Sequence, residues 1–176
     1  MATSGILPDD ELTRVSTTVA EEFTDAYYNA LNTARNTIAS FYVPPSNISP
    51  GRDLPLITSN GTQLSDPIAF QNTFEQMPYT HFEIQSLNAH VTNPSITNIA
   101  AFNGKPSKRD LEQNMSLLVQ VGGYVRFLER KEGPMRGFSD TLVLVPNKEE
   151  VGGRGKAKSG EGRSWLIQTQ NFRFTV

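Results

Sequence analysis

The sequence predicts an α+β fold in which two helices pack against one face of a bent antiparallel sheet. Apolar residues recur every three or four positions through most of the first forty residues, and again after residue 66. This spacing is typical of amphipathic helices. From residue 81 onward, apolar and polar residues alternate in four long runs, as in strands that bury one face. Helices followed by strands favour α+β over an alternating α/β fold.

Composition narrows the class of protein. The 176 residues are 37% hydrophobic, enough for one domain with a sizeable core. Cysteine is absent, which excludes disulfides, thiolate metal sites and a cysteine nucleophile. No apolar stretch has the roughly 20 residues of a membrane-spanning helix, and the N-terminus lacks the basic start and apolar run of a secretory signal.

Charge is distributed unevenly along the chain. Residues 1–100 carry three basic groups against ten acidic ones, a net charge of −7, whereas residues 101–176 carry thirteen against eight, a net charge of +5. Such asymmetry predicts two surfaces of different charge for partners. We expect a flexible tail at 1–11 and one domain at 12–176, with polar insertions at about 103–113 and 147–162.

The first helix is predicted to run from Leu12 to about Ile38, because apolar positions follow one helical stripe over this stretch. The Pro44–Pro45 pair prevents it from continuing. Tyr27 and Tyr28 lie about 100° apart on such a helix, so we expect only one of them at the centre of the buried stripe.

The segment between the predicted helices is rich in turns, with Asn60-Gly61 between short strand-like pieces at 54–58 and 62–64. Asp66 followed by Pro67 predicts the start of a second helix, with the acid as its N-cap and the proline in its first turn. The expected buried stripe of this helix consists of Ile68, Phe70, Phe74 and Met77.

Four strands are predicted after the second helix, at 81–91, 116–128, 138–145 and 165–176. In the first strand the alternation changes phase, which predicts a β-bulge near Gln85-Ser86. Gly122-Gly123 interrupts the second strand, where glycine weakens or bends a strand.

Several of these segments, in this order, resemble the nuclear transport factor 2 family. Phe23 to Tyr42 resembles the first helix of that family, and the run from Leu118 to Val125 (LVQVGGYV) resembles its V-x-V-x-G strand. The run from Phe138 to Leu144 resembles F-x-Q-x-F-x-L, although Asp140 stands where the family usually has glutamine. Asn171-Phe172-Arg173 resembles its terminal D-x-F-R. The resemblance extends over residues 20–176.

The resemblance implies a cone-shaped sheet wrapped on helices and pairing through its open face. The long loops and the Phe-Arg-Phe ending resemble most the small subunit of the fungal messenger-RNA export receptor. They therefore imply a non-catalytic adaptor that pairs with the related domain of a larger subunit and shuttles between nucleus and cytoplasm. The implied partners are that subunit and, through the heterodimer, Phe-Gly repeat proteins of the pore. Two alternatives within the family are a homodimeric import carrier for a small GTPase and a dehydratase or isomerase.

The last predicted strand indicates a partner-binding face. Phe172 and Phe174 share one parity and suit the helix-packed core, which sends Arg173 to the opposite face. Covering an arginine among apolar residues on that face costs free energy unless a partner supplies a carboxylate. The resemblance implies such an acid in the larger subunit. The alternative is an arginine that stays solvated on an exposed edge. The predicted interface consists of Val143, Trp165, Ile167, Thr169, Asn171 and Arg173.

Two basic segments fall in the predicted insertions. Their positive charge predicts electrostatic contact with RNA phosphates. They contain no interleaved aromatic residues, so stacking on RNA bases is not indicated. The candidate residues are Lys105, Lys108, Arg109, Arg154, Lys156, Lys158 and Arg163. The Gly-rich run around Lys156 does not match a phosphate-binding loop, because Ala157 follows the lysine in place of serine or threonine.

Catalytic chemistry has few candidates. His81 and His90 are the two histidines, and their spacing on a bulged strand does not define a metal site. Asp140 shares the parity of Phe138 and Leu142, so we expect it to face the core, where a charged carboxylate needs a hydrogen-bond partner. We therefore expect no enzyme activity, no metal and no cofactor.

Overall fold

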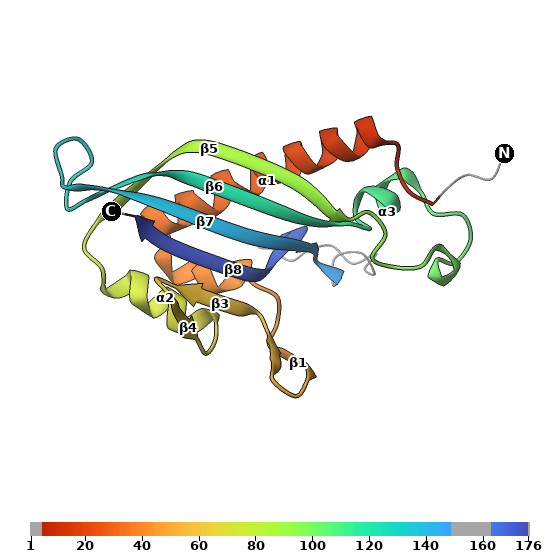
Figure 1. Ribbon diagram of the computed structural model, residues 1–176, viewed down its shortest axis with the longest axis horizontal. Helices are drawn as coiled ribbons and strands as arrows, with labels where there is room; N and C mark the ends of the chain where they lie inside the picture. The colour runs from red at the N-terminus through yellow and green to blue at the C-terminus, as the bar shows by residue number, and fades with distance from the viewer. Residues whose placement is uncertain (1–4, 149–162, 176) are drawn as a thin grey trace.

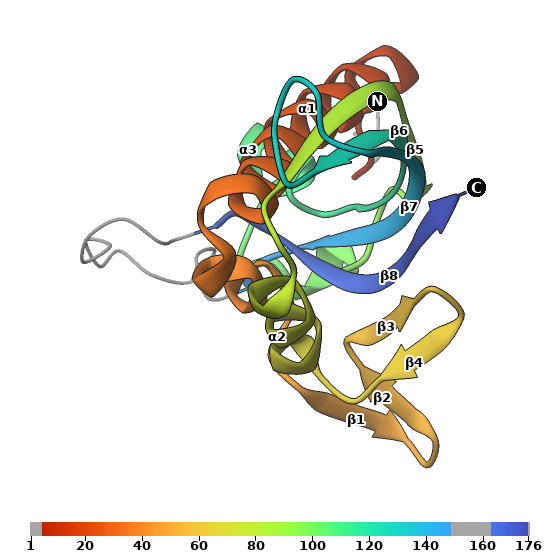
Figure 2. The ribbon, with the colours of Figure 1, turned by 90° about the vertical axis from the view of Figure 1, so that its left-hand side faces the viewer.

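Helices α1 and α2 lie on one side of a curved six-stranded sheet in the computed structural model (Figures 1 and 2). The structure describes residues 5–148 and 163–175. Most of the predicted insertion at 147–162 therefore lies outside the described residues. No helix in the described part of the chain is long and apolar enough to cross a membrane.

The predicted first helix is two helices. Helix α1 spans Asp9–Thr33, and a 3-10 helix, η1, follows at Arg35–Phe41. The prediction of one continuous helix was wrong at Ala34, where φ and ψ of −139° and 52° break the helical path. Helix α1 also begins three residues earlier than predicted, directly after Pro8, with three acids in its first turn.

Helix α2 spans Pro67–Gln76 and starts as predicted. The Asp66 side chain accepts a hydrogen bond from the backbone N–H of Ala69 at 2.8 Å, which caps the helix. Phe70 and Phe74 are buried, but the prediction for Ile68 was wrong, since it is 53% exposed. The β5–β6 connection adds a short 3-10 helix, η2, at Ile99–Ala101 and helix α3 at Lys108–Glu112.

The main sheet has the strand order β4-β3-β8-β7-β6-β5. Its strands are β3 (Leu56–Ser59), β4 (Thr62–Leu64), β5 (Thr80–Asn93), β6 (Ser116–Phe127), β7 (Met135–Pro146) and β8 (Trp165–Thr175). Consecutive strands from β5 to β8 pair antiparallel, as expected, but β3 pairs with β8 in parallel, so the sheet is mixed. A separate hairpin of β1 (Ser46–Ser49) and β2 (Arg52–Leu54) was not predicted.

The bulge predicted in β5 is present. The register with β6 shifts between Ile84 and Ser86, which leaves Gln85 as the extra residue. Gly123 of β6 lies opposite this bulge, and a β-carbon there would be 2.1 Å from the Glu83 carbonyl oxygen. The glycine is therefore needed for the close approach of the two strands.

A second bulge, in β8, overturns one prediction. Val143 pairs with Thr169 whereas Leu144 pairs with Ile167, so one extra residue lies between them in β8. The extra residue inverts the alternation before it. Trp165 and Ile167 therefore point into the core, where Ile167 is fully buried, and their predicted place on the outer face was wrong.

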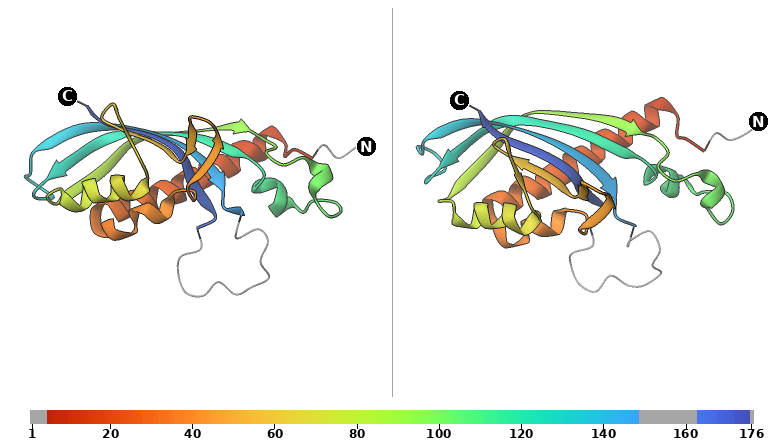
Figure 3. Two further views of the ribbon diagram at one scale, coloured as in Figure 1. Left: turned by 90° about the horizontal axis from the view of Figure 1, so that it is seen from below. Right: turned by 60° about the horizontal axis from the view of Figure 1, so that its bottom comes forward.

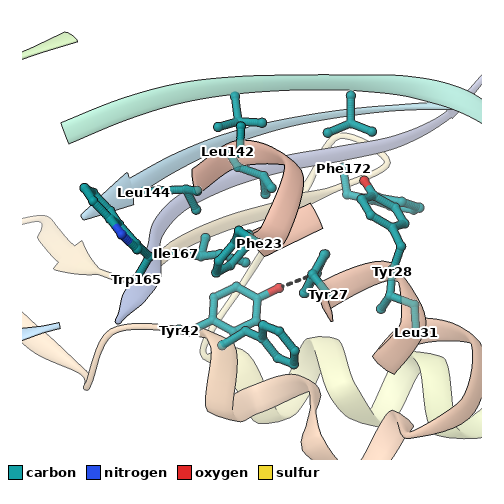
Figure 4. Packing of buried hydrophobic residues seen from close by; sticks show 14 of the residues in the cluster. Phe23, Tyr27, Tyr28, Leu31, Tyr42, Leu142, Leu144, Trp165, Ile167 and Phe172 are labelled. Carbon is teal, nitrogen blue, oxygen red and sulfur yellow. Dashed lines mark hydrogen bonds between the residues drawn. The ribbon is translucent and has the colours of Figure 1, made fainter. Parts of the chain in front are cut away.

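The core lies between the helices and the sheet, as Figure 4 shows for part of it. Most aromatic ring pairs between α1, α2 and the strands pack edge-on or tilted, for example Phe82 on Phe138 at 5.1 Å between ring centroids, and two pairs are stacked. Tyr27 and Tyr28 are both buried, against the expectation that only one would be. The hydroxyl group of each finds a hydrogen-bond partner in the interior, which makes burial of both possible.

The segment predicted as a polar insertion at 103–113 is part of the domain. Ser107 and Asp110 form a capping box that starts α3. Lys108 forms an ion pair with Glu11 at 2.8 Å, which ties α3 to the start of α1.

Candidate functional site

One face of the six-stranded sheet carries no described helix. Helices α1 and α2 lie under the concave side, and the opposite side, here called the outer face, is left uncovered (Figure 3). Its side chains alternate with the buried ones along each strand, and most of them are half-buried or exposed. The outer face is therefore a surface on which another protein could dock.

Arg173 is exposed on this face, as its parity with Phe172 predicted. It pairs across the strands with Ser139. Its guanidinium lies over the β3–β4 turn, since a β-carbon on Gly61 would be 3.8 Å from Nη2 of Arg173. None of the ion pairs between described residues includes Arg173. Its charge is thus available to an acid from outside the chain.

A second arginine lies beside Arg173. Arg136 and Arg173 both line an open hollow of about 550 Å³ with Asn60, Phe174 and Thr175. The Arg136 guanidinium carbon is 5.4 Å from the centroid of the Phe174 ring, a cation–π contact that holds it in place. The hollow suits a carboxylate, because two cations flank it.

The other predicted interface residues divide into two groups. Val143, Thr169 and Asn171 lie on the outer face with Arg173, half-buried or exposed. Trp165 and Ile167 lie on the inner face because of the bulge in β8. The sequence carries a signal for that bulge that the sequence analysis missed, because the apolar residues change parity between Ile167 and Phe172.

The interior holds a polar cluster around Asp140, which is 1% exposed. Tyr28 donates a hydrogen bond from its hydroxyl to Oδ2 of Asp140 at 2.9 Å, and the Gln170 amide nitrogen donates to the same oxygen at 2.9 Å. Gln170 also contacts the hydroxyl groups of Tyr27 and Tyr42, which lie 2.9 Å from each other. The predicted inward orientation of Asp140 and its hydrogen-bonded state are confirmed.

Burial raises the pKa of Asp140 from 3.8 to about 7, although the hydrogen bonds from Gln170 and Tyr28 oppose the shift. Burial, and after it the nearby charge of Asp140, raises the pKa of Tyr28 well above its ordinary value. Oδ1 of Asp140 has no hydrogen-bond partner among the described residues. This carboxyl group therefore takes up a proton far more readily than one in water.

A carboxyl group with a raised pKa in a closed interior is not by itself a catalytic site. Among the described residues, Asp140 and Gln170 are each 1% exposed and Tyr28 is 3% exposed, so this cluster does not open onto the surface. A substrate would have to displace packed aromatic side chains to reach the carboxyl group. His81 and His90 lie on β5, away from this cluster, and the described residues contain no group of three metal-binding side chains.

The predicted RNA-contact residues do not form one continuous arm in the described part of the chain. Lys105 and Arg109 are exposed in the β5–β6 connection, whereas Lys108 is engaged by Glu11. Arg163 stacks on Phe41 with 3.3 Å from its guanidinium carbon to the ring centroid, so its side chain belongs to the folded domain. The remaining candidates, Arg154, Lys156 and Lys158, lie outside the described residues, as does the Gly-rich run around them.

Arg35 has a structural role that sequence analysis did not predict. Its guanidinium donates to the backbone carbonyls of Phe74 and Met77 at 2.7 Å each, and to that of Pro78 at 2.8 Å. These carbonyls end α2, where a positive charge is favourable. Arg35 thus locks the end of α2 to the η1 segment that follows α1.

A long helix and a second helix under a curved, open-faced sheet define a nuclear-transport-factor-2-like fold. The model of the nuclear transport factor 2 (NTF2) domain matches residues 19–153. The chain belongs to this family. A search of curated protein sequences returned no significant match.

Solved structures of similar fold include Mtr2 and a complex that contains it. The chain resembles the structure of Mtr2 with a TM-score of 0.70, at 20% identity over 92% of this chain and 99% of that one. It resembles a chain of the Chaetomium thermophilum Mex67 NTF2-like domain complexed with Mtr2 with a TM-score of 0.68, at 21% identity and the same coverage. Nuclear transport factor 2 from Cryptosporidium parvum is less similar, with a TM-score of 0.56 at 21% identity over 91% of this chain and 94% of that one.

Proposed function

We propose that the protein is a non-catalytic adaptor subunit that binds, through the outer face of its sheet, the homologous domain of a larger messenger-RNA export receptor. The heterodimer carries messenger RNA through nuclear pores and shuttles between nucleus and cytoplasm. Contact with the Phe-Gly repeats of pore proteins is made by the heterodimer. The adaptor needs no cofactor.

The observation that carries this proposal is Arg173 on an uncovered sheet face. It lies next to Arg136 in an open hollow, without an ion-pair partner among the described residues. An arginine that pairs with a partner's acid in a desolvated interface fixes both affinity and orientation. The similarity to Mtr2 over nearly the whole length of both chains supports the same reading.

RNA contact is the second part of the proposal. Lys105 and Arg109 present two exposed cations on the β5–β6 connection, and Arg154, Lys156 and Lys158 add three from the segment outside the described residues. Such side chains attract RNA phosphates without reading sequence.

The test is affinity purification of the tagged protein from nuclear extract, followed by mass spectrometry. Recovery of a larger subunit with an NTF2-like domain, together with pore proteins, is the expected result. Recovery of a small GTPase with the protein as a homodimer would support the import-carrier alternative instead. Recovery of neither, together with turnover of a small molecule that Asp140→Asn abolishes in a folded protein, would support the dehydratase or isomerase alternative.

A further inference from the structure

A row of uncharged polar side chains crosses the outer face of the sheet. The strand registers place one member of the row on each of the six strands, in neighbouring positions. From β5 to β4 the members are Asn88, Gln120, Thr141, Asn171, Thr58 and Gln63. Four amides and two hydroxyl groups thus lie side by side, perpendicular to the strands.

The hydrogen-bonding capacity of this row is unused within the described residues. Four of its members are exposed and two, Thr58 and Thr141, are half-buried. None of the six side chains takes part in a hydrogen bond found among the described residues, in contrast to the buried amide of Gln170. Amides and hydroxyl groups both donate and accept, so the row offers bonds of either direction to a second surface.

Charge is scarce around the centre of the row. On β6, β7 and β8, the rows to either side contain apolar or small residues, with Arg173 as the one charged member. These flanking positions are Leu118, Val143, Thr169, Gly122, Ser139 and Arg173. Other charged or titratable side chains of the outer face, such as Glu83, His90 and Arg126, lie toward its margin on β5 and the end of β6. A centre depleted of charge, with charged side chains toward the margin on β5 and β6, has the composition of the centre of a protein–protein interface.

We infer that this row sets the register of the sheet-to-sheet contact with the homologous domain of the larger subunit, and so helps to select that partner. The inference rests on the proposed function. Six strands about 4.8 Å apart give a row roughly 24 Å long, which matches the width of another six-stranded sheet. In the correct register the partner satisfies the amides and hydroxyl groups. In a wrong register they are desolvated without partners, which is costly.

The experiment measures heterodimer affinity by isothermal titration calorimetry, with the NTF2-like domain of the larger subunit from the same organism as the probe. The test variant is Thr141→Val combined with Gln120→Met, two near-isosteric changes at the centre of the row. The matched control is Thr17→Val combined with Gln76→Met, the same changes at exposed positions of α1 and α2. Circular dichroism melts of all proteins check that each one folds.

The test variant is expected to bind about 10- to 100-fold more weakly than the wild type, and the control within about twofold of it. Because the removed groups are uncharged, the loss should be the same at low and high salt, unlike the loss caused by a change at Arg173. Unchanged or tighter binding of the test variant, with a wild type that binds, would overturn the role of the row and leave the heterodimer intact. A wild type that does not bind the domain at all would overturn both proposals.

Discussion

The inner and outer faces of the sheet are built from the same strands but differ in burial and in the side chains they present. On β8, Phe172 is fully buried among aromatic rings, while its neighbours Asn171 and Arg173 are exposed on the other side. The inner face carries the stabilising contacts of the domain, and its side chains are buried under the helices. The outer face keeps uncharged polar groups and the arginine Arg173 without partners among the described residues, as our proposal of a docking surface requires. In this proposal, stability and recognition are separated on alternate residues of one strand.

The largest effect is expected from the inner face. Phe172→Ala should lower the free energy of unfolding by about 3–5 kcal/mol, because it removes a fully buried ring and leaves a cavity. Asn171→Ala, one residue away on the outer face, should change it by less than about 0.5 kcal/mol. Urea unfolding of both variants measures the difference. Equal losses would contradict the separation of the two faces.

The outer face should show the opposite behaviour. Arg173→Ala should cost about 2–5 kcal/mol of binding to the partner domain, because it leaves an acid of the partner buried without a counter-charge. Arg173→Asp should be worse, and changing the partner's acid to arginine should recover part of that loss. Titration against the partner domain measures these effects, and circular dichroism should find the fold unchanged. Wild-type affinity for Arg173→Ala would remove the main support for the interface.

The polar cluster inside the core should make stability depend on pH. The pKa of Asp140 is raised to about 7 in the folded protein, so between about pH 4 and 7 the folded state holds a proton that the unfolded state has lost. The contribution of Asp140 to stability is therefore full below pH 4 and falls as the pH rises through 7, by about 2–4 kcal/mol.

Asp140→Asn removes this titration without a change of shape. The variant should be more stable than the wild type above pH 7, and its free energy of unfolding should vary less from pH 5 to 8. Thermal melts across that range provide the measurement. A wild type whose stability rises over the same interval would show that the carboxyl group is ionised in the fold.

The smallest effect is expected at the basic residues. Neutralising Lys105 and Arg109 should leave heterodimer formation unchanged, since both side chains are exposed and lie outside the outer face. If they contact RNA, affinity should fall equally for all sequences, and the slope of affinity against salt should decrease by about 1 per lost phosphate contact. Filter binding at several salt concentrations tests this, and unchanged binding at low salt would exclude these two residues from the RNA surface.

Local signals in the sequence determined much of the fold. Asp66-Pro67 marked the start of α2, Asn60-Gly61 the turn between β3 and β4, and the phase change near Gln85 the bulge of β5. Each signal depends on a few neighbouring residues: an N-cap, a turn that needs positive φ, or an alternation that skips one position. The sequence also placed Asp140 inside and Arg173 outside, because strand alternation holds where no bulge intervenes.

Only the tertiary structure decided the features that join distant segments. In β8 the apolar residues change parity between Ile167 and Phe172, but only the pairing with β7 shows that both groups face the core, so that Ile167 is buried. Tyr28 is buried because Asp140, 112 positions later, accepts its hydrogen bond, and Arg35 is held by carbonyls at the end of α2. The uncharged row of the outer face likewise exists only once six strands are in register. Helix caps and turns are local and can be found from neighbouring residues, whereas the partners of a buried hydroxyl group or an extended row of amides are fixed by how the whole chain packs.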